Sequence, residues 1–149
     1  MANVPGLDAW IATDGGAAFV WGATDCCLFV ADWVAARSGR DPAAAWRGSY
    51  RSLRQAHRLL KRRGGIVAAV SLEMDRLGFE RTSDPLPGDV AIVTVPSGFR
   101  SGRIHYSDVA AIRVGRLWAV KGHRGMAGGD FPVRVAWALN LEDDPHDAR

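Results

Sequence analysis

The chain of 149 residues is long enough for one domain with a buried core, and 48% hydrophobic against 23% charged residues is the balance of a globular protein. Asp25 and Asp32 interrupt the longest apolar run, so no membrane-spanning segment is predicted, and the first residues lack the basic and apolar parts of a secretory signal. The net charge of +3 is unevenly spread, with seven cations and no acid between Arg47 and Arg63 and a mostly acidic end. We therefore expect neither a membrane protein nor a secreted disulfide scaffold.

Helices are predicted in the first half of the chain, where apolar residues recur at helical spacing between capping residues. They cover residues 7–13, about 25–37, 42 to a stop at Gly48, 52–63 and 66–77. Asp41 before Pro42 predicts the start of the third helix, and Ser52 is expected to cap the fourth.

Strands are predicted after Gly78, where the apolar period changes to two. They cover residues 89–95, 109–114, 117–121 and 133–139, the second and third forming a hairpin around Gly115-Arg116. Helices followed by strands predict an α+β fold with an antiparallel sheet. We expect a single domain over residues 1–140 and a disordered acidic tail at 141–149.

Both cysteines of the chain, Cys26 and Cys27, lie at the start of the second predicted helix. Adjacent cysteines cannot form an ordinary disulfide, and neither a CxxC spacing nor a His pair completes a zinc site, so we expect no metal and no other cofactor. The unpaired N–H groups and the positive end of a helix dipole favour a thiolate here, and the thiolate is the nucleophile. Free cysteine is also a common packing residue. Cys26 shares a stripe with Phe29, Val30 and Trp33 and is expected to point towards the core or the sheet. Cys27 lies about 100° around the helix, so we expect different roles for the two thiols.

A catalytic thiol needs a base, and the chain has four histidines. His57 lies among arginines and His146 lies in the tail, so neither is a candidate. His105 precedes and His123 follows the predicted hairpin over residues 109–121, whose open end would bring them close together. Each is otherwise an ordinary loop histidine; of the two, His105 is the favoured candidate for the base and His123 is the less favoured substitute.

Several motifs, taken in order, resemble those of the NlpC-type (papain-like) cell-wall cysteine peptidases. The run Asp25-Cys26-Cys27-Leu28-Phe29-Val30 is similar to their Asp-Cys-Ser-Gly-(apolar)-Val nucleophile motif, and Pro87-Gly88-Asp89-Val90 is similar to their strand entry. The hairpin over residues 109–120 resembles the strand pair that follows. A small phage and prophage tail-associated branch is closer still, through Trp21-Gly22, Asp25-Cys26-Cys27, Gly39-Arg40-Asp41-Pro42, Trp46-Arg47-Gly48-Ser49-Tyr50, Gly64-Gly65, Gly88-Asp89-Val90 and Ala136-Trp137. The resemblance covers roughly residues 7–139.

This resemblance implies a papain-like α+β fold in which Cys26 is the nucleophile and a sheet supplies the histidine. It also implies a cysteine peptidase or amidase that opens peptidoglycan during phage DNA entry. Such a protein would be made in the host cytoplasm, act in the virion tail and have tail hub or tip proteins as partners. Two positions depart from the family: Asp108 stands where the catalytic histidine belongs, and the third, orienting polar residue falls near Ala119. His105 is three residues before Asp108, on the opposite face of a strand.

Two further interpretations remain open. The chain could be a structural component of the tail tip that keeps the fold and has lost the chemistry, since a fold does not fix a function. The basic segment from Arg47 to Arg63 fits either a solvated helix face or a surface that follows nucleic-acid phosphates. The solvated face is favoured, because no base-reading motif accompanies the charge.

Overall fold

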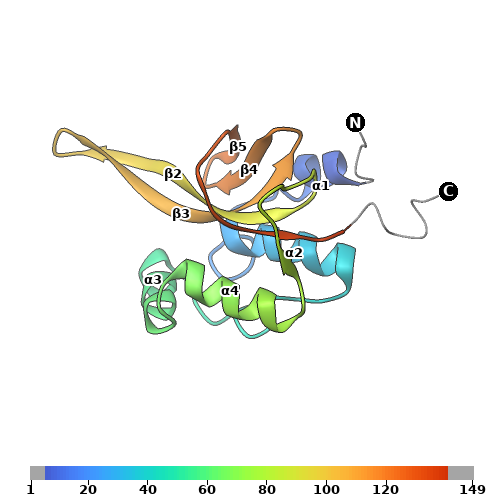
Figure 1. Cartoon of the computed structure of the whole chain (residues 1–149). Coiled ribbons are helices and arrows are strands. Elements are labelled where there is room, and N and C mark those ends of the chain that lie inside the picture. Colours follow the sequence, from blue (N-terminus) through green and yellow to red (C-terminus); the bar gives the residue numbers. More distant parts are fainter. Residues whose placement is uncertain (1–5, 141–149) are drawn as a thin grey trace.

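The computed structural model describes residues 6–140, which form four helices and one antiparallel sheet of six strands (Figure 1). The helices are α1 (Leu7–Thr13), α2 (Cys26–Ser38), α3 (Leu53–Arg62) and α4 (Ile66–Arg76). The strands are β1 (Glu80–Arg81), β2 (Val90–Arg100), β3 (Arg103–Val114), β4 (Leu117–Gly122), β5 (Gly125–Gly129) and β6 (Val133–Ala138), in the spatial order β1-β6-β2-β3-β4-β5. The α+β class and the antiparallel sheet are thereby confirmed. The expected acidic tail at 141–149 lies outside the described residues, and none of the described helices is both long and apolar enough to cross a bilayer.

The helix predictions hold within one or two residues, except for the one after Asp41. Residues 42–48 form turns instead, although the Asp41 carboxylate accepts from the Ala43 N–H at 2.9 Å, as a helix cap would, and also pairs with Arg47. Gly48 has a φ of 71° and donates its N–H to the carbonyl of Gly22, so no helical hydrogen bond continues through it. The predicted third helix is therefore wrong.

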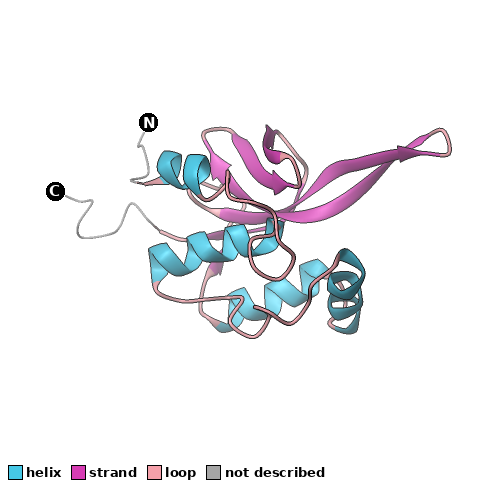
Figure 2. Cartoon of the chain, turned by 180° about the vertical axis from the view of Figure 1, so that it is seen from behind, coloured by secondary structure: helices cyan, strands magenta, loops and turns pink. Residues whose placement is uncertain are grey.

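The β2–β3 hairpin is much longer than predicted. Beyond Val95 and Ser107 the two strands continue as a ribbon that projects from the domain (Figure 2), a segment we call the arm (residues 96–106). Its turn is Ser101-Gly102, with φ values of 54° and 76°, the positive pair that a tight two-residue hairpin turn requires. Pro96, Ser97 and Gly98 break the apolar alternation, so the pattern did not predict these strand residues. The glycine-rich β5 was missed for the same reason.

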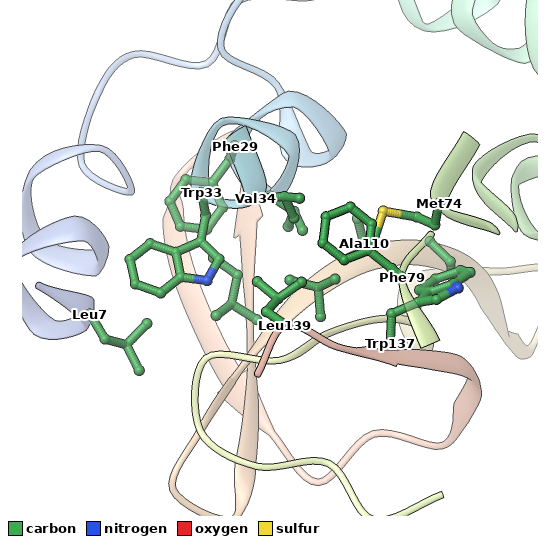
Figure 3. Close-up of a cluster of buried hydrophobic side chains, with 13 residues drawn as sticks. Leu7, Phe29, Trp33, Val34, Met74, Phe79, Ala110, Trp137 and Leu139 are labelled. Atoms are coloured by element: carbon green, nitrogen blue, oxygen red, sulfur yellow. The ribbon is translucent and has the colours of Figure 1, made fainter. Parts of the chain in front are cut away.

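The helices cover one face of the sheet, and the main core lies between the helices and that face. Figure 3 shows Phe29, Trp33 and Val34 of α2 beside Ala110 of β3 and Leu139, the residue after β6, all of them buried. A second buried cluster lies on the opposite face of the strands. It comprises Ala91, Val93, Ala111, Trp118, Val120 and Ala136. Alternate residues of β3 thus serve two cores, which accounts for the nearly continuous apolar run of that strand.

The Pro-Gly-Asp corner fixes α2 against the sheet. The Trp33 indole donates to the Gly88 carbonyl at 2.9 Å, and the Asp89 carboxylate accepts from the N–H groups of Leu86 and Leu139 at 2.8 and 3.0 Å. Burial raises the pKa of Asp89, and these two hydrogen bonds oppose that shift. The motif therefore has a structural task, which is to hold the helix that carries the thiols.

Candidate functional site

The buried Asp25 carboxylate holds the start of α2. Its Oδ1 accepts from the N–H groups of Cys27 and Leu28 at 3.0 and 2.9 Å, and its Oδ2 accepts from the Gly22 N–H and the Tyr50 hydroxyl. Asp25 is 1% exposed, so all four donors satisfy one desolvated group. The first helical turn is therefore rigidly placed.

Gly22 and Tyr50 bring two loops together next to the first turn of α2. Gly22 has a φ of 80°, and a Cβ there would lie 2.0 Å from the Tyr50 carbonyl oxygen. Burial raises the pKa of Tyr50, and its hydrogen bond to Asp25 raises it further, so the phenol stays a neutral donor. Sequence analysis noticed the Trp46–Tyr50 motif, but no local signal shows that its hydroxyl reaches Asp25.

The pKa values of the two thiols are shifted in opposite directions. Their mutual hydrogen bond is the largest influence on both: it lowers the pKa of Cys26, against burial and Asp25, and it raises the pKa of Cys27 well above the usual value. Burial adds to the rise for Cys27, which packs against the main core, while the Ala110 backbone lowers its pKa. Cys27 rather than Cys26 therefore contacts the core, contrary to the expectation from the helical stripe. Cys26 is the thiol suited to nucleophilic attack.

A cavity of about 880 Å³ opens in front of α2, and both thiols line it. Its walls are mostly apolar, and they extend from Phe19 and Trp21 past the first turn of α2 to α3 and the arm. A space of this size holds a small peptide segment, because ligand cavities are commonly 300–1,000 Å³.

His123 lies at one end of this cavity, on the turn after β4. Its ring stacks on Phe19 with a centroid distance of 4.1 Å and meets Trp21 at 5.5 Å. Lys121, two residues earlier, has its ammonium 5.8 Å from the ring of Phe29, which lies one helical turn after Cys26 on the same side of α2. Cys26 and His123 both line this extended cavity, and no hydrogen bond among the described residues joins them.

His105 belongs to the arm and does not line that cavity. It pairs with Gly98, whereas the β3–β4 ladder ends at Ile112 and Ala119. Seven residues separate His105 from Ile112, about 23 Å along a strand, and over that length β3 pairs with β2 alone. The β3–β4 hairpin therefore stops pairing at Ile112 and Ala119, and His105 lies on the arm, away from His123.

The place that the resemblance assigns to a histidine holds an ion-paired carboxylate. Thr94 donates to Asp108 at 2.6 Å, and Arg134 pairs with its other oxygen at 2.9 Å, so a polar row crosses β6, β2 and β3. Ala119, at the third position, has no polar side-chain atom. Sequence analysis missed Thr94 and Arg134, because only the sheet order places them beside Asp108.

No group of three or more His, Cys, Asp or Glu side chains among the described residues is arranged to hold a metal ion. Cys26 and His123 supply a thiol and an imidazole to the cavity.

Comparison with known proteins gives a family for the chain. Neither the curated proteins nor the solved structures contain a match. The model of a family described as a domain of unknown function, DUF6950, matches residues 4–135, which is most of the chain. The chain belongs to the DUF6950 family.

Proposed function

We propose that the protein is a papain-like cysteine peptidase or amidase of a phage tail, in which Cys26 cleaves an amide bond of peptidoglycan. One observation carries the proposal: the Cys26 thiol, with its lowered pKa, lies in the first turn of a firmly capped helix and lines a cavity of peptide size. The resemblance to the NlpC-type peptidases supports the substrate and the location in the virion tail.

The chemistry requires three groups around the scissile carbonyl. The Cys26 thiolate attacks the carbonyl carbon, and the backbone N–H of Cys26, at the positive end of α2, stabilises the oxyanion. The His123 imidazolium then gives its proton to the leaving amine, and a thioester to Cys26 remains. The neutral imidazole then takes a proton from a water molecule as that water attacks the thioester carbonyl. The carboxylic acid is released, and the Cys26 thiolate and the imidazolium are restored.

His123 is the better base because it shares the cavity with Cys26, whereas His105 does not. Its stacking on Phe19 and Trp21 orients the ring in place of the polar residue that Ala119 cannot supply. The free protein need not contain the thiol–imidazole hydrogen bond, since catalytic hydrogen bonds are often long without substrate.

Cleavage of purified muropeptides tests this proposal. Cys26→Ala should abolish release of new amines, His123→Ala should slow it by about 100-fold, and His105→Ala should change it by less than about twofold. His105→Ala is the matched control, since it removes an equal side chain outside the cavity. Cleavage that survives Cys26→Ala, in a variant with unchanged circular dichroism, would contradict the mechanism.

A structural tail-tip component with the same fold is a second candidate, favoured by the Asp108–Arg134 pair at the histidine position. Under this alternative the thiol has no chemical task. Slow iodoacetamide reaction of Cys26 at neutral pH, like that of a buried thiol, would support the structural role, and fast reaction would count against it.

A further inference from the structure

The arm exposes large apolar side chains that the domain itself does not cover. Phe99, Tyr106 and Ile104 are 70%, 61% and 53% exposed. Phe99 pairs directly with Ile104, and Tyr106 is two residues further along β3, so all three lie on one face of the ribbon. Exposed apolar side chains gathered in this way mark an interaction site.

The helix α3 is also poorly covered. Ala56 is its only fully buried residue, and Leu53 is 49% exposed. Leu53, His57 and Leu60 recur at intervals of four and three residues, which places them along one side of the helix. Ala56 lies on the same side and is buried, so the domain covers the middle of this side and leaves Leu53 and His57 exposed.

The arm and α3 form the two walls of one groove. They lie at the same end of the molecule in both views (Figures 1 and 2), and Phe99 and Arg100 of the arm line the same cavity as Leu53 and Leu60. A smaller hollow of about 480 Å³ at the base of the arm is lined by Lys61, Ile66 and Asp108, among others. We call the space between α3 and the arm, which includes both hollows, the α3–arm groove. Its walls are mostly apolar.

Cations lie at the rim of the groove on both walls: Lys61 of α3 lines the smaller hollow, and Arg100 of the arm lines the larger cavity. Arg103 of the arm adds a third, and none of the three forms an ion pair with another described residue. Arg100 and Arg103 are direct cross-strand partners, an arrangement in which like charges repel. Anionic groups on a bound partner would relieve that repulsion.

We propose that the α3–arm groove binds an acidic amphipathic helix of a partner protein. The apolar stripe of such a helix would cover the groove residues at i, i+3, i+4 and i+7 spacing, and its acidic flanks would meet the cations of the rim. A nucleic-acid backbone would pair with the cations but leave the leucines of α3 in water. A polypeptide with an apolar stripe would cover both, so it is the better match for this groove. The groove is continuous with the cavity that Cys26 lines, and binding of the helix requires no reaction of the thiol.

Fluorescence anisotropy with synthetic helices tests the groove. The probe is a labelled peptide of about 18 residues, five helical turns, with Leu at the i, i+3, i+4 and i+7 positions and Glu or Gln elsewhere. The comparison ligands are the same composition scrambled, the same stripe with Lys in place of Glu, and a DNA duplex of about 20 base pairs, two helical turns. The acidic striped peptide should bind at least tenfold tighter than each of the others, about 1.4 kcal/mol. Equal binding of the scrambled peptide, or tighter binding of DNA at physiological salt, would overturn the proposal.

Variants locate the binding on this surface. Phe99→Ala and Arg100→Glu should each weaken the striped peptide by about tenfold, because one removes an apolar anchor and the other reverses a rim charge. Leu117→Ala and Arg116→Glu are matched controls, since both residues are exposed on the β3–β4 turn, where Leu117 is 47% exposed. Equal losses in the control variants, with all four proteins folded by circular dichroism, would show that the groove is not the binding site.

Discussion

Two neighbouring residues of one type acquire different chemistry here because they face different surroundings. Cys27 packs on the main core beside Ala110 of β3, where burial disfavours a charge. Cys26 lines the cavity and has the hydrogen bond that stabilises its thiolate. The second cysteine thus supports the first, in the place where the resembling family has serine.

This relation predicts the behaviour of substitutions at Cys27. Cys27→Ala removes the donor that lowers the pKa of Cys26, so the pKa should rise, and at neutral pH a smaller thiolate fraction should slow alkylation. Cys27→Ser retains a donor and should leave the pKa lowered. The measurement is the iodoacetamide rate of Cys26 from pH 5 to 10, read by mass spectrometry of the modified peptide.

The two variants control each other, because each leaves Cys26 as the only thiol. A midpoint of the alkylation profile that is higher for Cys27→Ala than for Cys27→Ser is the expected result. Coinciding profiles would show that the hydrogen bond does not set the acidity of Cys26.

The approach of two loops to the first turn decides the placement of α2. Asp25 alone predicts the helix start, but its Oδ2 is satisfied by Gly22 from one loop and by Tyr50 from another. Both contacts require the close packing that the missing Cβ of Gly22 permits.

Gly22→Ala should therefore destabilise the protein by about 3 kcal/mol or more, since the methyl group must displace the Tyr50 backbone and loosen a buried hydrogen bond. Gly39→Ala is the matched control, because Gly39 has a similar φ of 74° and no atom within 4 Å of its Cβ position. That variant should lose only about 1 kcal/mol, the cost of the left-handed backbone. Urea unfolding of both variants gives the comparison, and equal losses would contradict the close-approach argument.

The whole molecule consists of a packed domain and a projecting arm, and these contribute unequally to stability. None of residues 96–106 is fully buried, whereas the same strands supply Ile92, Val93 and Ile112 to the cores. The arm therefore adds little apolar burial to the domain.

Replacement of residues 97–105 by Asn-Gly, a favoured two-residue turn, should leave the thermal midpoint within about 4 °C of the parent protein. The alkylation rate of Cys26 should also stay within about twofold, because the shortened hairpin does not touch the first turn of α2. Differential scanning calorimetry and the iodoacetamide assay measure the two quantities. A fall of the midpoint by about 10 °C would show instead that the arm is part of the folding unit.

Much of the fold follows from local pattern. Asp25 and Ser52 predict helix starts because a short oxygen-bearing side chain satisfies the free N–H groups of its own first turn. The same rule failed at Asp41, whose carboxylate is engaged by Arg47 in a segment that Gly48 ends. Cys26 could be nominated as a nucleophile for the same local reason, because its position relative to a helix start is a property of its neighbours.

Sequence alone thus determined the α+β class, most element boundaries and the thiol at the start of α2, since these depend on residues within one or two turns. Tertiary structure alone decided which histidine shares a cavity with Cys26, that Arg134 and Thr94 hold Asp108, and that β2 and β3 extend into an arm. These outcomes depend on backbone pairing between distant segments and on one turn at Ser101-Gly102. A one-residue change in register would turn every side chain of such a strand to the other face, so no local pattern contains that information.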